Sequence, residues 1–319
     1  MKYQLIIERL DCLQISYKTD YDLAKSSYFQ TGGSVALAVY PNTIEKFTNL
    51  VAYFSSKNLD YSIFGWTSNV IFKDDTNIEI GIFSTKMRSI SFEDVVYAEA
   101  GMMLPKMCNM LAKESISGFE ELQGIPATLG GAIYMNAGCY GNEISRHLIS
   151  VTIITKDGCL KEMQKSECKF GYRYSIFHEI DCIILSAKFI KNKGDKNILL
   201  NKILKLHNHR HFILEYGYRN VGSVFVTHDL YSDLAKNHLA YKIVLFFIRF
   251  FIHKVFRVKT NKFLNFVTFS FFHLNKFLSI VSVKTMNVLI NSGSGTKAIE
   301  EYIYEVQALT DNRVEIEVI

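Results

Sequence analysis

The chain has 319 residues and a net charge of +5, and 49% of its residues are apolar and 21% are charged. This composition allows a large core in two or three packed units, and it excludes a disordered protein. The six cysteines form no Cys-x-x-Cys pair, so we expect reduced thiols in a cytoplasmic protein and no metal site. Charges interrupt the first apolar run, and no run reaches about 18 uncharged apolar residues, so we expect neither a signal peptide nor a membrane-spanning helix.

The first third of the chain predicts strands around one helix. Apolar runs at 35–40 and 61–64 are typical of buried strands. Between them, Asn42 or Thr43 caps a helix that ends at about Lys57. No Gly-x-Gly-x-x-Gly motif opens a helix, which distinguishes this segment from a dinucleotide-binding Rossmann unit.

The rest of the chain predicts strands, a hairpin and further helices. Asp157-Gly158 lies between two apolar runs, which is a strong hairpin signal. The predicted elements are a strand at 95–100, a helix over about 105–114, hairpin strands at 150–155 and 160–163, a strand at 182–189, a Lys/His-rich helix after 192, a strand at 287–290, a helix over about 296–308 and a strand at 313–319.

Two glycine-bearing loops are candidates for ligand binding. One is Gly65–Asn69, and the other is the run from Gly124 to Gly141. Glycine lets the backbone approach a ligand closely, and the exposed N–H groups of such loops can hold phosphates. Each loop alone is more typical of a turn, and Gly130-Gly131-Ala132 is equally consistent with tight backbone packing.

The residue patterns of these loops and their order along the chain are more specific evidence of function. Gly124-Ile-Pro-Ala-Thr-Leu-Gly-Gly-Ala132, followed by Asn136-Ala-Gly-Cys-Tyr-Gly141, resembles the FAD-binding signature of the UDP-N-acetylenolpyruvoylglucosamine reductase (MurB) family. Residues 28–33 and 64–69 resemble two further motifs of that family. The chain departs from the family at Gln30, where an arginine is usual, and at Trp66, Thr67 and Ala127, where glycines are usual.

The resemblance implies FAD as the cofactor and NADPH as the hydride donor. It also implies that the glycine loops hold the cofactor. The implied cofactor-binding residues are Gly32, Gly33, Gly65, Trp66, Thr67, Ser68, Asn69, Gly124, Ile125, Pro126, Thr128, Gly130, Gly131, Ala132, Asn136 and Gly138.

Three segments resemble the catalytic motifs of the family: 168–177, 221–225 and 314–319. The resemblance assigns Arg173 to the enolate-stabilising arginine, Ser223 to the proton donor and Glu317 to the assisting carboxylate. A forked guanidinium suits a substrate carboxylate, and a hydroxyl suits proton delivery. Taken singly, each has an ordinary interpretation as a surface charge, a turn residue or the polar face of a strand.

The resemblance stops between residues 226 and 283. Residues 241–280 contain eleven phenylalanines and seven Lys/Arg but no Asp or Glu. On a helical wheel Lys242, Arg249, His253 and Arg257 share one face. This pattern fits a core or self-associating helix, a helix on an anionic membrane surface, or a nucleic-acid contact, although no known nucleic-acid module is present and we expect no such partner.

We therefore expect an α+β protein. Residues 1–195 would be a two-lobed FAD-binding domain of the PCMH/VAO type, with lobes at about 1–85 and 86–195, and 196–319 a substrate domain with a divergent segment at 229–280. The implied function is NADPH-dependent reduction of UDP-N-acetylglucosamine enolpyruvate to UDP-N-acetylmuramate in cell-wall synthesis. The alternatives are another sugar nucleotide of surface-polysaccharide synthesis, or a non-catalytic flavoprotein that docks on a membrane or partner through 241–280. The oligomeric state stays open.

Overall fold

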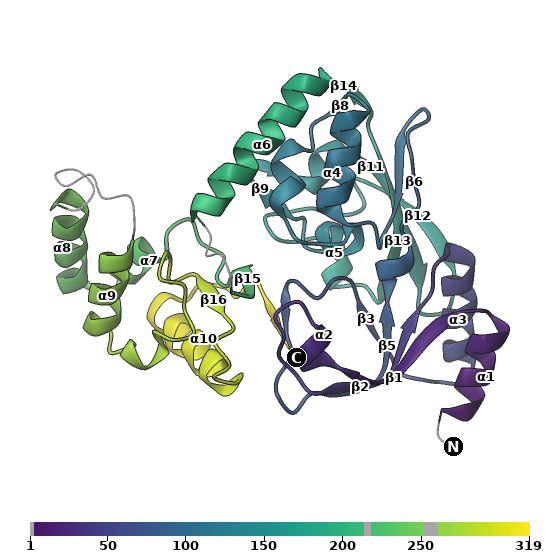
Figure 1. Cartoon of the computed structure of the whole chain (residues 1–319), viewed down its shortest axis with the longest axis horizontal. Helices are drawn as coiled ribbons and strands as arrows, with labels where there is room; N and C mark the ends of the chain where they lie inside the picture. Colours follow the sequence, from purple (N-terminus) through teal and green to yellow (C-terminus); the bar gives the residue numbers. More distant parts are fainter. Residues whose placement is uncertain (1–2, 214–217, 252–260) are drawn as a thin grey trace. The chain divides into compact units, whose positions relative to one another are not determined.

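A computed structural model describes residues 3–213, 218–251 and 261–319 (Figure 1). Contacts divide the chain into two units. Unit 1 contains Met1–Asp22, Ser34–Ser68 and Asn77–Arg210, and unit 2 contains Leu23–Gly33, Asn69–Thr76 and His211–Ile319. Each unit has its own hydrophobic core, and together they mix helices and strands, which confirms the predicted α+β class.

The first lobe of unit 1 is a four-stranded sheet with the strand order β1-β2-β5-β3. β1 is antiparallel to β2, whereas β2 and β3 are both parallel to β5. Thr43 caps α3 as predicted, because its hydroxyl accepts the Lys46 N–H at 3.2 Å. The elements are α1 (Gln4–Cys12), β1 (Ser16–Asp22), β2 (Ser34–Tyr40), α3 (Ile44–Ser56), β3 (Ser62–Phe64), β5 (Asn77–Phe83) and η1 (Ser84–Lys86).

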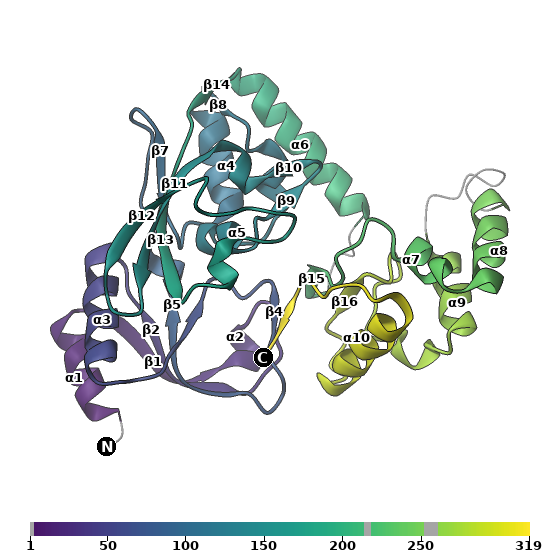
Figure 2. The same ribbon diagram turned by 180° about the vertical axis from the view of Figure 1, so that it is seen from behind.

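The second lobe is a five-stranded antiparallel sheet with the order β12-β11-β13-β7-β6 (Figure 2). The predicted hairpin is β11–β12, and Gly158 takes φ +85° in its turn. The elements are β6 (Ile90–Ser91), β7 (Val96–Glu99), α4 (Leu104–Lys113), β8 (Ile116–Ser117), η2 (Glu120–Gly124), α5 (Leu129–Tyr134), β9 (Gly138–Cys139), β10 (Asn142–Glu143), η3 (Ile144–His147), β11 (Leu148–Thr155), β12 (Leu160–Gln164), η4 (Ile176–His178), β13 (Cys182–Phe189), β14 (Asn192–Lys193) and α6 (Lys196–Ile213).

Unit 2 packs helices around a two-stranded β15-β16 ladder and a parallel β17-β4 pair. Its core takes residues from α7, α8, α9 and α10, including the buried Tyr241, Phe269 and Tyr302. The elements are α2 (Leu23–Ser26), β4 (Val70–Ile71), β15 (Asn220–Ser223), α7 (Leu230–Lys236), α8 (Leu239–Ile248), α9 (Lys262–Phe271), η6 (Asn275–Phe277), β16 (Val288–Ile290), α10 (Lys297–Thr310) and β17 (Glu317–Val318).

The structure changes two sequence predictions in unit 2. The predicted terminal strand is shorter, with regular pairing only in β17 and a single bridge from Val314 to Phe225. On the predicted basic face, Arg249 is not open to solvent partners alone, because its charge is offset by an ion pair with Asp229 at 2.6 Å, while Lys242 is exposed. The other two members of that face, His253 and Arg257, lie outside the described residues. Within the described part of the chain, no helix combines the length and apolar character that crossing a bilayer requires.

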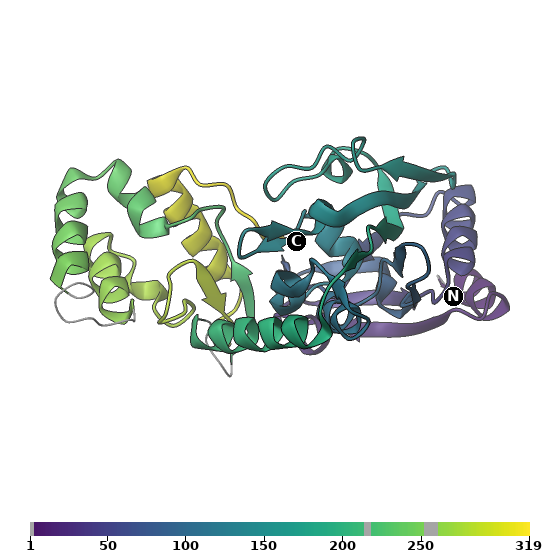
Figure 3. The same ribbon diagram turned by 90° about the horizontal axis from the view of Figure 1, so that it is seen from above.

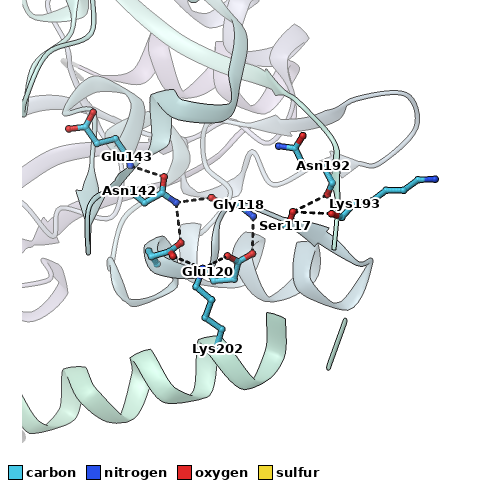
Figure 4. Close-up of polar contacts among 9 residues, drawn as sticks. Ser117, Gly118, Glu120, Asn142, Glu143, Asn192, Lys193 and Lys202 are labelled. Atoms are coloured by element: carbon cyan, nitrogen blue, oxygen red, sulfur yellow. Dashed lines mark hydrogen bonds and ion pairs between the residues drawn. The ribbon is translucent and has the colours of Figure 1, made fainter. Parts of the chain in front are cut away.

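α6 is fastened to the second lobe by an ion-pair cluster (Figure 4). Lys202 of α6 lies 3.0 Å from the buried carboxylate of Glu120 and 2.5 Å from that of Glu121. Asn142 adds hydrogen bonds to Glu121 and to the Gly118 carbonyl. Burial acts to raise the pKa of Glu121, but the hydrogen bonds from Lys202 and Asn142 outweigh it, so this pKa lies below the ordinary value.

Apolar contacts also hold α6 against the second lobe. Leu199 and Ile203 of α6 pack on Ala112 of α4, and the two helices lie beside each other (Figure 1). Because α6 rises about 1.5 Å per residue, the cluster at Lys202 fixes His209 and Arg210 roughly 12 Å further along the helix.

We expect Lys202→Met to lower the free energy of unfolding by roughly 1–3 kcal/mol, since it leaves the buried Glu120 carboxylate without its cation. We expect a loss near the lower limit of this range because Lys202 is half-exposed and solvent screens its charge. Chemical denaturation at pH 7 measures the loss, with Lys205→Met on the same helix as the matched control.

The pH dependence of this loss has a defined sign. The folded-state pKa of Glu121 is lowered, so its contribution is complete above about pH 4.3 and disappears as the pH falls through the folded value. The difference between wild type and Lys202→Met should therefore shrink on acidification. A difference that stays constant between pH 7 and pH 3.5 would contradict the assignment.

Candidate active site

The two glycine-bearing loops meet in unit 1. Gly65 follows β3, and Thr128 precedes α5, more than sixty positions later in the printed sequence. A Cβ on Gly65 would lie 2.2 Å from the hydroxyl oxygen of Thr128, which is closer than any side chain tolerates. Glycine at position 65 is therefore required for the two loops to touch.

Main-chain hydrogen bonds hold the glycine run against residues 100–102. The N–H groups of Leu129 and Gly130 donate to the carbonyls of Met102 and Ala100, both at 2.8 Å. A Cβ on Gly130 would lie 3.0 Å from the Cβ of Ala100. Gly130 thus serves close backbone packing, which is the ordinary interpretation of this motif.

Gly131 has a different environment. It is exposed, and a Cβ there would meet only the Thr128 hydroxyl, at 3.5 Å. Its backbone therefore faces open space without a side chain, next to the loop that contains Gly65. This is the part of the run that a phosphate or ring could approach.

Asn136 ties the glycine run to the segment that contains Arg173. Its side chain is buried, and its Nδ2 donates to the Gly171 carbonyl at 2.8 Å and to the Glu143 carboxylate at 3.0 Å. Its Oδ1 accepts the Ser145 N–H at 3.4 Å. The amide of Asn136 is therefore engaged by the protein, and its part in a cofactor site is to hold the loop.

Arg173 lies against the same run. Its Nη2 donates to the Gly138 carbonyl at 2.9 Å, and its guanidinium carbon is 5.0 Å from the centre of the Tyr172 ring. Arg173 also takes φ +52°, a left-handed conformation that is uncommon for a residue with a side chain. The structure thus brings the predicted catalytic arginine to the predicted cofactor loop.

Two side chains of α6 at this run were missed by sequence reasoning. Arg210 of α6 covers Gly124, whose Cβ would lie 2.7 Å from the arginine Cδ, and its Nη1 is 3.8 Å from the Cys139 sulfur. His209 is hydrogen-bonded to the Tyr140 hydroxyl at 3.2 Å. Within the basic sequence of α6 nothing distinguishes Arg210 from its neighbours, so only the fold could select it.

Ser223 and Glu317 lie in unit 2, on neighbouring segments. Val224, next to Ser223, accepts the Glu315 N–H at 2.7 Å, and Phe225 bridges Val314 in antiparallel register. Beyond this point the two segments pair with other strands, Ser223 with Val288 of β16 and Glu317 with Val70 of β4, and both residues are exposed.

Two asparagines hold these segments. Asn287 binds the backbone just after Ser223, since its Oδ1 accepts the Phe225 N–H at 2.8 Å and its Nδ2 donates to the Phe225 carbonyl at 3.1 Å. Asn69, a predicted cofactor ligand, instead donates its side-chain amide to the Glu315 carbonyl at 3.0 Å. Its carbonyl also accepts the Glu317 N–H at 2.9 Å, so Asn69 fixes the segment that carries Glu317.

Gly32 and Gly33 are required by packing within unit 2. Cβ atoms on them would lie 2.4 Å from the Cβ of Phe72 and 2.3 Å from the Thr76 carbonyl oxygen. The neighbouring Thr31 hydroxyl is buried and, among the described residues, has no hydrogen-bond partner.

The departures from the family pattern leave room for a flavin. Trp66 is 40% exposed and so does not plug the loop, and Ala127 packs its methyl group on the core of the second lobe. Thr67 takes φ +56°, which is the conformation that glycine adopts easily. Within unit 1, these features and the bare backbone at Gly131 fit FAD.

Comparison with known proteins also indicates that the chain binds FAD. Residues 35–164 match the family described as FAD binding domain. UDP-N-acetylenolpyruvoylglucosamine reductase of Streptococcus suis (strain 05ZYH33) is 32% identical over 218 residues, which cover 68% of this chain and 72% of that protein. The reductase of Listeria innocua is 36% identical over 212 residues, which cover 66% and 71%.

A solved structure shares the fold. The crystal structure of the reductase (MurB) from Thermus caldophilus aligns with a TM-score of 0.68 at 20% identity, covering 95% of this chain and 98% of that one. These matches confirm the predicted FAD-binding fold, the cofactor FAD and the class of FAD-dependent oxidoreductase. The chain belongs to the UDP-N-acetylenolpyruvoylglucosamine reductase family.

Proposed function

We propose that this chain reduces UDP-N-acetylglucosamine enolpyruvate to UDP-N-acetylmuramate with FAD and NADPH, as the names of its relatives suggest. The observation that supports this most is the hydrogen bond from Arg173 to the Gly138 carbonyl in the glycine run. It joins the side chain that the reaction needs to the loop that the cofactor needs, within one unit.

In this proposal Arg173 binds the enolpyruvyl carboxylate. The bond to Gly138 uses one nitrogen of the guanidinium, and the fork has further N–H donors. Bound FAD would supply the hydride chemistry, with NADPH as the donor and the β-carbon of the substrate as the acceptor. The negative charge that then develops on the enolate is stabilised by the permanent positive charge of Arg173.

Ser223 is the proposed proton donor at the α-carbon, and Glu317 is the proposed assisting carboxylate. Support comes from the neighbouring segments that carry them, which are joined by the hydrogen bond from Glu315 to Val224, and from the exposure of both residues. Asn287 holds the backbone beyond Ser223, which keeps the hydroxyl in a defined position.

For cofactor binding we propose two kinds of contribution. The backbone of residues 65–68 and of Gly131 would contact FAD, whereas Asn69, Gly130 and Asn136 would act by shaping the loops, since their polar or steric roles are already used within the protein. We keep residues 1–195 as the FAD-binding domain and 196–319 as the substrate domain. Cytoplasmic location is proposed because the six cysteines are unpaired thiols.

The divergent segment 229–280 makes another sugar nucleotide the second candidate substrate. It lies in the proposed substrate domain, and α8 and α9 belong to it. The first test is the absorbance spectrum of the purified protein before and after anaerobic NADPH, followed by enolpyruvyl sugar nucleotides. Flavin that bleaches with NADPH but is not reoxidised by UDP-N-acetylglucosamine enolpyruvate would favour the second candidate. A protein that takes up no flavin would overturn both.

We expect Arg173→Met to lower kcat by about 10²–10³-fold, since it removes a cationic partner of the developing charge. Stopped-flow reoxidation of the reduced flavin by substrate measures this step. Lys169→Met, in the same loop, is the matched control and should change the rate little. Equal losses in both variants would mean that loop disruption, not charge, explains the effect.

We expect Ser223→Ala to slow turnover by roughly 10²–10⁴-fold, because the α-carbon loses its proton donor. Reduction of the flavin by NADPH precedes this step and should keep its rate. Ser279→Ala, at an exposed position, serves as the control. A parallel loss of flavin reduction would show that the substitution acts on the cofactor and not on protonation.

We expect Gly131→Leu to raise the Kd for FAD at least about tenfold, equivalent to ~1.4 kcal/mol, by filling the open space above this glycine. The fold should tolerate the change, because the nearest atom to a Cβ there is 3.5 Å away. Flavin titration and thermal unfolding of the apoprotein separate the two effects. Unchanged FAD affinity would remove Gly131 from the cofactor site.

A further inference from the structure

α8 presents an apolar face to solvent. On its inner side Tyr241 and Leu245 are buried in the core of unit 2. On its outer side, in α8 and the three residues that follow it, large apolar residues are exposed by 41–73%; they are Leu239, Ile243, Phe246, Phe247, Phe250 and Phe251. Their spacing of three or four residues places them along one face of a helix.

The four phenylalanines of this face form one cluster. Phe246 stacks on Phe250 and Phe247 on Phe251, and edge-to-face contacts join the two pairs. A contiguous exposed cluster of rings differs from the single exposed apolar residues that are normal on a protein surface. Such a cluster indicates a surface that a binding partner covers when the protein functions.

α9 also exposes phenylalanines. α8 and α9 lie side by side within unit 2 (Figures 1 and 3). Phe263, Phe266 and Phe271 of α9 are 54%, 58% and 37% exposed, while Leu264 and Phe269 are buried. A cavity of about 140 Å³ opens beside Phe266 and Lys262 and is lined mainly by apolar atoms. We call the exposed apolar residues of α8, of the three residues after it and of α9 the phenylalanine face.

The segment that carries the phenylalanine face contains basic residues but no acidic ones. Residues 234–299 contain ten Lys or Arg and no Asp or Glu. Lys242 of α8 and Lys262 of α9 are exposed on the same helices as the phenylalanines. Arg249 pairs with Asp229 and Lys276 with Glu305. An apolar face accompanied by exposed lysines such as Lys242 and Lys262 is complementary to a surface that is apolar inside and anionic outside.

We propose that the phenylalanine face docks the protein on an anionic lipid bilayer. The rings enter the boundary between headgroups and acyl chains, and Lys242 and Lys262 bind lipid phosphates. A second copy of the chain fits less well, because a symmetric contact would bring these lysines together, and the segment 234–299 offers no carboxylate to pair with them. The inference is independent of the proposed reaction, since it uses no residue assigned to catalysis or to FAD.

The experiment is co-sedimentation of the full-length, flavin-loaded protein with vesicles. We expect binding to phosphatidylcholine vesicles that contain 50% phosphatidylglycerol, at least tenfold weaker binding to pure phosphatidylcholine, and a loss of binding as salt is raised. Phe246→Ser with Phe250→Ser should reduce binding at least tenfold, and Lys242→Glu with Lys262→Glu should do the same. The matched control is Leu5→Ser with Tyr304→Ser, at sites 73% and 74% exposed outside the face.

Two outcomes would overturn the proposal. One is that wild-type protein stays in the supernatant with the anionic vesicles, or binds neutral vesicles equally well. The other is that light scattering shows a dimer which the double phenylalanine variant converts to monomer, without vesicle binding by either. Flavin absorbance and its bleaching by NADPH report that each variant is folded, so a failed reaction and a failed docking surface give different results.

Discussion

The glycine run packs backbone on backbone against residues 100–104, and the candidate site in unit 1 depends on this contact. Leu129 and Gly130 donate to carbonyls of that segment, with Gly130 directly on Ala100. Once the run is fixed, Thr128 meets Gly65, and Gly138 meets Arg173. The absence of side chains at a few positions thus places a cationic group and two loops around one region.

Asparagine side chains supply hydrogen-bond partners to the main chain of these loops, as neighbouring strands do for each other within a sheet. Buried or half-buried main-chain groups need hydrogen-bond partners, and irregular segments cannot supply them to each other. Asn136 satisfies Gly171, Asn287 satisfies Phe225, and Asn69 satisfies Glu315. Each of these bonds ends next to a segment that holds a proposed catalytic residue. The asparagines therefore fix the backbone of the segments that hold the proposed catalytic residues.

The divergent segment of unit 2 is part of the fold and also a separate surface. Tyr241, Leu245 and Phe269 are buried in the core of the unit, so α8 and α9 contribute to its stability. Their outer sides remain apolar, which is unfavourable in water unless another surface covers them. No residue proposed for FAD binding or catalysis lies on these helices. The outer surface of this segment is therefore separate from the residues proposed for the reaction.

The sequence by itself determined the elements with strong local signals and the family. α3 with its Thr43 cap, the Asp157-Gly158 hairpin and α10 follow from periodicity and turn chemistry, which act between near neighbours in the chain. It did not predict β1, because this edge strand is largely polar and its partner β2 lies beyond a separate segment. The motifs of the family were readable because their residue types and order survive even where single glycines are replaced.

Only the tertiary structure decided which role each of those residues has. Gly130 and Gly131 are adjacent and chemically identical, yet one is packed on Ala100 and the other is bare. Arg249 was expected on an open basic face but pairs with Asp229, and Arg210 was not expected to cover Gly124. Burial, clash and ion pairing depend on atoms brought together from distant parts of the chain, and a pattern along the sequence does not contain those distances.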